Sequence, residues 1–346
     1  MQTRGYAAQA ADQPLTPFQF ERRATGDSDV QIAIEFCGIC HSDIHTARNE
    51  WRSTQYPSVP GHEIIGRVTA VGKDVKRFKP GQRVGVGCFV GSCGTCDSCK
   101  TGHENYCETG MTMTYGSVDQ DGKTQTFGGY SNQIVVTEHF VLNVPENLDP
   151  AGCAPLLCAG ITTYSPLRHV GVTKGSRVGV IGLGGLGHMA VKLAASLGAE
   201  VTMLSRSADK KADAKKLGAH DFVLTTGEGA FGKLANRFDA IIDTVSAKHD
   251  INGPISSLRR EGTLILVGAP PEPLDLVSFG LIFGRRKIMG SLVGGIPETQ
   301  EMLDHCGKHG ITSDIEMTTP ERINEAFERT LKGDVKYRFV IDCAKF

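Results

Sequence analysis

Four cysteines stand close together in the run GSCGTCDSCKTGHENYC, at Cys93, Cys96, Cys99 and Cys107. Thiolates at this spacing can surround one zinc ion tetrahedrally. Because four protein ligands leave no position for a substrate, we expect a structural site that folds an otherwise irregular loop. Seven residues separate Cys99 from Cys107 and no proline follows, which disfavours an iron–sulfur cluster. Few basic residues surround the cage, which disfavours a nucleic-acid-binding zinc knuckle.

A second set of potential metal ligands is spread over the chain: Cys40, His62 and Cys158. Two thiolates and one imidazole would leave one of the four zinc positions open, which is the arrangement of a catalytic zinc site. No local spacing brings the three together, so their meeting depends on the fold. The other five cysteines are expected to be small buried hydrophobic residues. They are Cys37, Cys88, Cys153, Cys306 and Cys343.

The run GLGGLG follows a strand-like run, RVGVI, and opens a helix-like run, GHMAVKLAASLG. This is the context of a dinucleotide-binding turn, whose helix N-terminus faces the cofactor phosphates. We expect Gly182 to permit the tight turn, Gly184 to admit a pyrophosphate, and Gly187 to let the helix pack on the strand. Gly185 and Leu186 complete the run. Turns of this kind also occur for packing alone, without a cofactor.

The end of the second strand of this unit should select the cofactor. An NAD enzyme usually has an acid there, about 20 residues beyond the turn, to bind the ribose 2′-hydroxyl. This chain has Ser205, Arg206 and Ser207 instead, followed by Lys210. Hydroxyls and cations favour a 2′-phosphate, so we predict NADP(H). The alternative is that Arg206 and Lys210 form a solvated face.

The length, charge and cysteine content of the chain limit the classes of protein to which it can belong. A length of 346 residues predicts about two domains. The net charge of −1, with acids and bases interspersed, argues against a nucleic-acid partner. No membrane partner is expected, since no long apolar run and no signal-peptide core are found. Eleven cysteines without an export signal favour metal thiolates over disulfides, which predicts a cytoplasmic protein.

The pattern of apolar runs predicts an α/β protein with two domains. Short β-type runs broken by Gly and Pro predict a barrel-like β domain over residues 1–152. From there to about residue 290, strands alternate with helices, which predicts a doubly wound dinucleotide-binding domain over 153–290. The final stretch, 291–346, has a helix-then-strand pattern and is expected to rejoin the first domain.

Several motifs resemble those of the zinc-dependent medium-chain alcohol dehydrogenases. The resemblance spans nearly the whole chain and is strongest to the cinnamyl-alcohol-dehydrogenase type of NADPH-dependent aldehyde reductase. The motifs that carry the resemblance to the superfamily are the four-cysteine run and CGICHSDIH (37–45), PGHEIIGRV (60–68), PLLCAGITTYSPL (155–167) and GLGGLGH (182–188). The runs GRRKIMGSLVGGIPETQEMLD (284–304) and DVKYRFVID (334–342) carry the resemblance to the cinnamyl-alcohol-dehydrogenase type. The resemblance implies a GroES-like β domain that holds two zinc ions and a Rossmann domain that binds NADP(H).

The resemblance also implies roles for single residues. Cys40, His62 and Cys158 match the catalytic zinc ligands, and Glu63 matches an acid beside the metal that can ligate it. Asp43 matches a carboxylate that orients the histidine ligand, although a turn or cap aspartate is the alternative. A proton relay is implied for Ser42 and His45.

Cofactor contacts are implied at positions distributed along the chain. His41 and Arg338 match phosphate contacts, although a surface strand position is the alternative for Arg338. Positions lining the cofactor cleft are Thr162, Val267, Gly268, Ala269, Ser291 and Val293. Trp51, Tyr56 and Met111 could line an apolar substrate pocket or could pack against the barrel.

The function expected from these motifs is interconversion of primary alcohols and aldehydes with NADP(H). Aromatic or medium-chain aldehydes, reduced with broad specificity, are the expected substrates. An NAD(H)-linked alcohol or polyol dehydrogenase is the alternative within the fold, and a non-catalytic protein that binds NADPH and zinc is a remote one.

The resemblance suggests a homodimer, in which the apolar run LDLVSFGLIFG (274–284) could serve as interface or could be buried.

Overall fold

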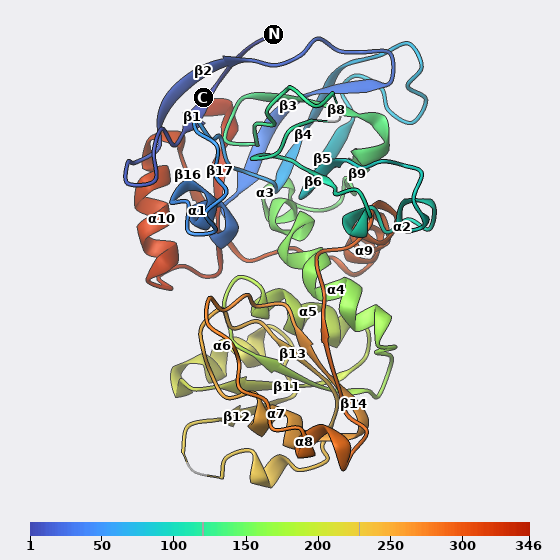
Figure 1. Cartoon of the computed structure of the whole chain (residues 1–346), viewed down its shortest axis with the longest axis vertical. Helices are drawn as coiled ribbons and strands as arrows, with labels where there is room; N and C mark the ends of the chain where they lie inside the picture. The colour runs from blue at the N-terminus through green and yellow to red at the C-terminus, as the bar shows by residue number, and fades with distance from the viewer. Residues whose placement is uncertain (120, 228) are drawn as a thin grey trace. The chain divides into compact units, whose positions relative to one another are not determined.

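The protein is described by a computed structural model that covers residues 1–119, 121–227 and 229–346 (Figure 1). Its contacts divide the chain into two compact units. The first unit comprises Met1–Cys158 and Gly294–Phe346, and the second comprises Ala159–Val293. Relative to the expected boundaries, residues 153–158 lie with the first unit and residues 291–293 lie with the second.

The first unit is built on a seven-stranded sheet in which every neighbouring pair is antiparallel except β16 and β17. In spatial order the strands are β16 (Ile315–Thr318), β17 (Arg338–Asp342), β3 (Asp29–Gly38), β4 (Ile64–Val71), β5 (Arg83–Val86) and β9 (Leu142–Asn143), and β8 (Gln133–Thr137) pairs with β3. Two small sheets pair β1 (Gln2–Ala7) with β2 (Thr16–Glu21) and β6 (Phe89–Gly91) with β7 (Thr112–Met113). Because β17 pairs with β3, the C-terminal segment is part of this sheet.

Two runs that predict β structure are each divided in the folded chain. SNQIVVTEHFVLNVP forms β8 and β9, separated by a 3₁₀ turn at Glu138–Phe140. QRVGVGCFV forms β5 and β6, which belong to different sheets. Periodicity alone cannot locate such breaks, because the apolar character continues through them.

The helices of the first unit are α1 (His41–Ala47), α2 (Asp97–Lys100), α3 (Pro150–Cys153), α9 (Ile296–His309) and α10 (Ile323–Leu331). In α10 the buried residues recur at helical spacing, and they are Ile323, Ala326, Phe327 and Thr330. Helix α9 ends at Gly310, whose φ of 65° lies in the left-handed region that favours glycine. Among the described residues, no helix of either unit combines the length and apolar character needed to cross a membrane.

The second unit is a six-stranded, wholly parallel sheet. Its strands, in spatial order, are β12 (Asp221–Leu224), β11 (Glu200–Ser205), β10 (Arg177–Ile181), β13 (Phe238–Asp243), β14 (Leu258–Leu266) and β15 (Lys287–Gly290). Its helices are α4 (Ala159–His169), α5 (Gly187–Ser196), α6 (Lys211–Lys216), α7 (Asn252–Ser257) and α8 (Phe279–Ile282). The strand order reverses between β10 and β13, where ligands of doubly wound sheets bind. This confirms the expected α/β plan.

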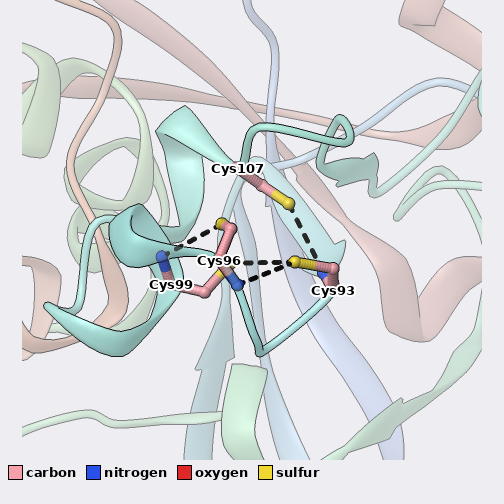
Figure 2. A group of neighbouring side chains, drawn as sticks. All are labelled: Cys93, Cys96, Cys99 and Cys107. Atoms are coloured by element: carbon pink, nitrogen blue, oxygen red, sulfur yellow. Dashed lines mark hydrogen bonds between the residues drawn. The ribbon is translucent and has the colours of Figure 1, made fainter.

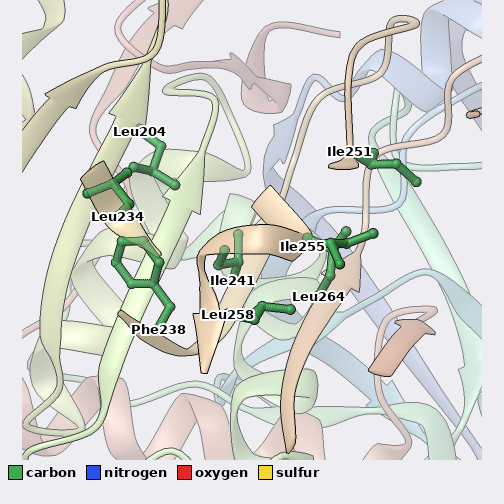
Figure 3. Close-up of a cluster of buried hydrophobic side chains, with 8 residues drawn as sticks. All are labelled: Leu204, Leu234, Phe238, Ile241, Ile251, Ile255, Leu258 and Leu264. Carbon is green, nitrogen blue, oxygen red and sulfur yellow. The ribbon is translucent and has the colours of Figure 1, made fainter. Parts of the chain in front are cut away.

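Apolar side chains from several strands form a core cluster in the second unit (Figure 3). Phe238 and Ile241 of β13 lie in it with Leu264 of β14, and α7 contributes Ile255. All four are fully buried, which fixes β13 and β14, and β13 pairs with β10, the strand that leads into the glycine-rich turn. The five cysteines outside the two metal sets are also buried, as expected.

Candidate metal centres and cofactor cavity

The three dispersed ligand candidates meet in the first unit. Potential ligand atoms of Cys40, His62, Glu63 and Cys158 all lie within 4.8 Å of one another, and all four residues are buried. The sulfur atoms of Cys40 and Cys158 are 3.9 Å apart. Two sulfurs bound to one tetrahedral zinc at about 2.3 Å would lie about 3.8 Å apart. The donor set and its spacing therefore fit a zinc ion.

The chain brings these ligands together from separate elements. Cys40 directly precedes α1, whereas His62 and Glu63 directly precede β4. Since β3 and β4 are antiparallel neighbours, with Cys37 opposite Ile64, both ligand segments lie at the same end of this strand pair. Cys158 follows a 3₁₀ turn, Ala154–Leu157, that packs against β3, β4 and β5.

A buried carboxylate, Asp43, organises the first ligand segment. One oxygen, Oδ1, accepts from the Gly61 N–H and lies 3.1 Å from Nδ1 of His62. The other, Oδ2, accepts from the Cys40 N–H at 2.9 Å and from the Tyr130 hydroxyl at 3.0 Å. An acceptor at Nδ1 requires a proton there, which leaves Nε2 of His62 free to bind a metal. Asp43 also caps α1, so the two roles considered from sequence are combined in one side chain.

Glu63 is enclosed beside the thiols. It is fully buried, and its Oε1 accepts a hydrogen bond from the Arg338 guanidinium. Burial raises the pKa of the Glu63 carboxyl, and the Arg338 cation opposes that rise. Its Oε2 is buried and has no hydrogen-bond partner among the described residues. An oxygen without a partner beside two thiols supports the expected position of Glu63 next to a metal.

Arg338 is buried, at 4% exposure, so the alternative of a surface strand position is wrong. Burial alone would lower the pKa of its guanidinium, but Glu63 and the thiols of Cys40 and Cys158 raise it above the usual value. The guanidinium therefore remains a cation beside the ligand set. Its contact with a cofactor phosphate stays a prediction.

The residues expected to relay protons lie on α1. Ser42 is half-buried, and its Oγ is 3.6 Å from the sulfur of Cys40. The side chain of His45 is 27% exposed, and its Nδ1 contacts the carboxylate of Glu50. Ser42 is therefore beside the ligand set and His45 reaches solvent, as a relay requires. Glu50 is a partner that sequence reasoning did not identify.

The residues considered for a substrate pocket differ in their surroundings. Trp51 is 53% exposed, and its ring centroid is 5.3 Å from that of His45. Tyr56 donates its hydroxyl to the Ala47 carbonyl at 2.9 Å, which anchors it against α1 and supports a packing role. Met111 is half-buried. Tyr115, which sequence reasoning missed, is buried and stacks on His62 with centroids 5.7 Å apart.

The four clustered cysteines form the second candidate metal centre (Figure 2). Their sulfur atoms lie within 4.8 Å of one another, and those of Cys93 and Cys99 are 3.9 Å apart. N–H groups point at the sulfurs: Cys93 accepts from Cys96 at 3.3 Å, and Cys107 accepts from Cys93 at 3.4 Å. Hydrogen bonds from Thr95 and Cys96 lower the pKa of Cys93 to about 5. This set fits a closed thiolate site for zinc.

The cysteine loop is fixed to α9 by a buried acid, Glu104. Its Oε2 accepts from the Ile296 N–H at 3.0 Å, and its Oε1 lies 2.7 Å from Nε2 of His139. Gly295 allows this contact, because a Cβ there would lie 1.7 Å from the carbonyl oxygen of Gly102. Sequence reasoning missed Glu104, since only the fold brings residues 104 and 296 together.

The glycine-rich turn has the geometry expected of it in the second unit. Gly182 has a φ of 87°, which L side chains rarely adopt. A Cβ on Gly187 would lie 1.8 Å from the Gly182 carbonyl oxygen, whereas one on Gly184 would meet nothing within 4 Å. Gly187 therefore permits close packing, and space remains at Gly184 for a ligand. The Thr244 hydroxyl donates to the Ile181 carbonyl at 2.8 Å and steadies this turn.

A cavity of about 590 Å³ adjoins the turn, and it is lined by residues of the second unit alone. Gly182 and Leu183 contribute one wall, while Ser205, Arg206, Ser207 and Lys210 contribute another. Ser205 ends β11 and is buried, whereas Arg206 is exposed. The hydroxyls and cations therefore adjoin a space at the carboxyl ends of the strands, which is where doubly wound folds bind dinucleotides.

The remaining positions expected near the cofactor lie at element ends. Val267, Gly268 and Ala269 follow β14, and Ser291 follows β15. A Cβ on Gly268 would lie 2.3 Å from the Val245 carbonyl oxygen, so this position requires glycine. Thr162 is buried in α4, and Val293 is buried with a φ of 42°. His41, by contrast, is exposed at the start of α1. Contacts of these residues with a cofactor stay predictions.

Known protein families and relatives match nearly the whole of this chain. Residues 26–146 match the alcohol dehydrogenase GroES-like domain, and residues 185–308 match the zinc-binding dehydrogenase family. NADP-dependent alcohol dehydrogenase C 1 of Mycolicibacterium smegmatis is 54% identical over 340 residues, which cover 98% of this chain and 97% of that relative. This chain belongs to the zinc-binding alcohol dehydrogenase family.

Solved structures agree with this family. A cinnamyl alcohol dehydrogenase from Sorghum bicolor is 47% identical and superposes with a TM-score of 0.96, covering 99% of this chain and 98% of that one. A cinnamyl alcohol dehydrogenase from Helicobacter pylori, complexed with NADP(H), is 45% identical with a TM-score of 0.92, covering 100% of this chain and 99% of that one. The resemblance inferred from the motifs and the fold class are both confirmed.

The four-cysteine loop of this alcohol dehydrogenase yields a direct test. Replacing one thiolate, in Cys99→Ser, should remove one of two zinc ions per chain, because a hydroxyl is a poor zinc ligand. Metal content measured by mass spectrometry after gel filtration should fall from two to one, with a lower melting temperature. Ser98→Ala, between two of the ligands, is the matched control and should retain both ions. Two zinc ions in Cys99→Ser would contradict the closed thiolate site.

Proposed function

We propose that this protein is a zinc-dependent oxidoreductase that interconverts primary alcohols and aldehydes with NADP(H). Reduction of aromatic or medium-chain aldehydes, with broad specificity, is the proposed main activity. The observation that carries the proposal is the convergence of two thiols and one imidazole, 4.8 Å or less apart, in a buried set with a neighbouring acid. Three such ligands leave one position of a tetrahedral zinc for a substrate oxygen.

When bound, zinc supplies Lewis acidity toward the substrate oxygen, and NADP(H) supplies or accepts the hydride. The proposed zinc ligands are Cys40, His62 and Cys158, and Asp43 keeps His62 in the tautomer that leaves Nε2 available. Glu63 is the proposed alternative ligand. Arg338 holds its carboxylate and balances the negative charge of the thiolates.

The proposed proton path uses residues of α1. Ser42 holds a hydroxyl beside Cys40, where it can donate a proton to a developing alkoxide or accept one from an alcohol. His45 contacts Glu50 and is partly exposed, so it can exchange that proton with solvent. Trp51 and Tyr115 place aromatic rings beside His45 and His62, which supports an aromatic or apolar substrate.

We also propose that two copies associate through the β15 edge of the six-stranded sheet. Strand β15 ends that sheet, and an edge strand presents unpaired N–H and C=O groups. The run at 274–284 is exposed rather than buried: Phe279 is 65% exposed, Ile282 is 66% and Phe283 is 84%. Exposed apolar residues beside a free edge favour a homodimer. We propose a cytoplasmic location, because the eleven cysteines are present as thiols, which a reducing compartment preserves.

Activity is tested by comparing NADPH- and NADH-dependent reduction of an aromatic aldehyde in wild type and Cys158→Ser. We expect NADPH to be favoured in wild type, and kcat to fall by about 10³-fold or more in Cys158→Ser, since removing a ligand disables the metal site. The variant should keep one zinc. Cys153→Ser, a buried cysteine outside both metal sets, should keep both zinc ions and most of the activity. One zinc and no turnover in wild type would indicate a non-catalytic NADPH-binding protein.

Cofactor choice is tested by Arg206→Asp. A carboxylate at the end of β11 should repel a 2′-phosphate, so kcat/KM for NADPH should fall by about 10–100-fold while that for NADH changes little. Lys211→Asp introduces the same charge change on the neighbouring α6, outside the cavity lining. That control should retain NADPH preference. Equal losses in the two variants would contradict a specific role for Arg206, and NADH preference in wild type would favour the NAD-linked alternative.

The dimer proposal is tested by light scattering coupled to gel filtration. Phe283→Asp places a charge in the exposed apolar run and should yield a monomer, because an interface cannot bury an unpaired carboxylate cheaply. Leu224→Asp is the matched control, since Leu224 is 42% exposed on β12 at the opposite edge of the same sheet. It should remain dimeric. A monomeric wild type, or a monomer only in the control, would contradict the β15 interface.

A further inference from the structure

A buried carboxylate lies beside the cofactor cavity of the second unit. Asp243 is the last residue of β13, is only 2% exposed, and is opposite Ile181 in the parallel pair β10–β13. Neighbouring strands are about 4.8 Å apart, and Gly182 of the glycine-rich turn directly follows Ile181. Negative charge at Asp243 would therefore act on a dinucleotide phosphate bound at that turn. An ionised carboxylate in this position needs a compensating cation.

The compensating group is His249. Its Nε2 lies 2.7 Å from the Asp243 carboxylate, and its Nδ1 lies 2.8 Å from the Ala247 carbonyl oxygen. A carbonyl oxygen and an ionised carboxylate can only accept hydrogen bonds, so both ring nitrogens must carry protons unless Asp243 itself is protonated. Either arrangement adds one proton and makes the pair neutral. Burial raises the pKa of Asp243, while the hydrogen bonds from Val245 and His249 oppose that rise.

The same contacts fix a loop that forms one wall of the cavity. Val245, Ala247, Lys248 and His249 all line it. The Val245 N–H donates to Asp243 Oδ1 at 3.1 Å, and the Ala247 carbonyl is held by the His249 ring. The side chain of Lys248 lies 3.5 Å from Asp275, so the basic side chain of this loop that contacts Asp243 is His249. The loop therefore depends on His249 for its conformation as well as for its charge.

We propose that His249 is a cofactor-positioning residue, which neutralises Asp243 beside the glycine-rich turn and holds residues 244–249 against the dinucleotide cavity. The ligand class is a dinucleotide with a 2′-phosphate, so this inference rests on the proposed function. The proposal assigns no proton transfer in the reaction to His249. The role of His249 is electrostatic, because an uncompensated buried acid would repel the negative phosphates of the cofactor.

The test measures the Kd of NADPH by fluorescence in four forms of the full protein: wild type, His249→Asn, Asp243→Asn and the double variant. His249→Asn leaves Asp243 uncompensated, so its Kd should rise by about tenfold or more. Asp243→Asn removes the charge and should change Kd by less than about threefold. The double variant should bind at least about threefold more tightly than His249→Asn, because removing the carboxylate removes the repulsion, while the lost contact with the Ala247 carbonyl keeps it weaker than wild type. A residue needed only for packing would give no such recovery.

A control variant and the zinc content distinguish a loss of charge compensation at Asp243 from a general loss of structure. His220→Asn removes a histidine of the same unit whose Nδ1 accepts from the Val201 N–H, outside the cavity, and its Kd for NADPH should be unchanged. Zinc content should be the same in all variants. Wild-type affinity in His249→Asn, or a double variant as weak as His249→Asn, would overturn the charge role while leaving the proposed function intact. If wild type binds no NADPH, the proposed function fails, and this inference fails with it.

Discussion

The first unit depends on one buried carboxylate, Asp43, whose oxygens accept from the backbone of Cys40 and Gly61, the His62 ring and the Tyr130 hydroxyl. A fully buried carboxylate is costly without partners, so these four donors must converge for the fold to form. They come from the start of α1, the segment before β4 and the segment before β8. The hydrogen bonds that satisfy Asp43 therefore also bring together Cys40 and His62, two of the three proposed zinc ligands.

Tight packing around this network leaves little freedom for its backbone. A Cβ on Gly61 would lie 2.6 Å from the Tyr130 ring and 2.8 Å from the Cys37 sulfur, and Gly61 has a φ of 105°. A Cβ on Gly38 would lie 1.9 Å from Glu63 Oε2. Glycines at these two positions let β3 and the His62 segment approach closely enough for the ligands to meet. The hydrogen bonds to Asp43 and the close packing at Gly38 and Gly61 therefore require the same backbone arrangement.

The two units solve a similar electrostatic problem with different groups. In the first, Arg338 is buried against Glu63 and the thiols, and in the second, His249 is nearly buried against Asp243. In each case a basic side chain contacts a buried acid close to the end of a strand. Low dielectric makes such pairs important, because an uncompensated buried charge is far more costly than an exposed one. The structural cage differs, since backbone N–H groups stabilise its thiolates.

The sequence by itself determined the features encoded over short distances. The spacing of Cys93, Cys96, Cys99 and Cys107 predicts their cage, and the GLGGLG turn with its flanking strand and helix predicts the φ of Gly182 and the close approach at Gly187. The alternating pattern of the second unit predicts its parallel sheet, because buried strands and amphipathic helices have distinct periods. The residue types of Cys40, His62 and Cys158 suggest a zinc site, but only family resemblance implies that they meet, since no periodicity links positions as far apart as Cys40 and Cys158, which are separated by 118 residues.

Only the tertiary structure decided which distant partners meet. It paired Asp43 with Tyr130, Arg338 with Glu63, and Glu104 with Ile296, contacts that span 87, 275 and 192 residues. It exposed the run around Phe283, whose composition alone suits a core equally well. It also divided two β-type runs between strands. The physical reason is common to all of these: burial, hydrogen-bond satisfaction and charge compensation depend on the neighbours that the fold supplies, which local sequence does not specify.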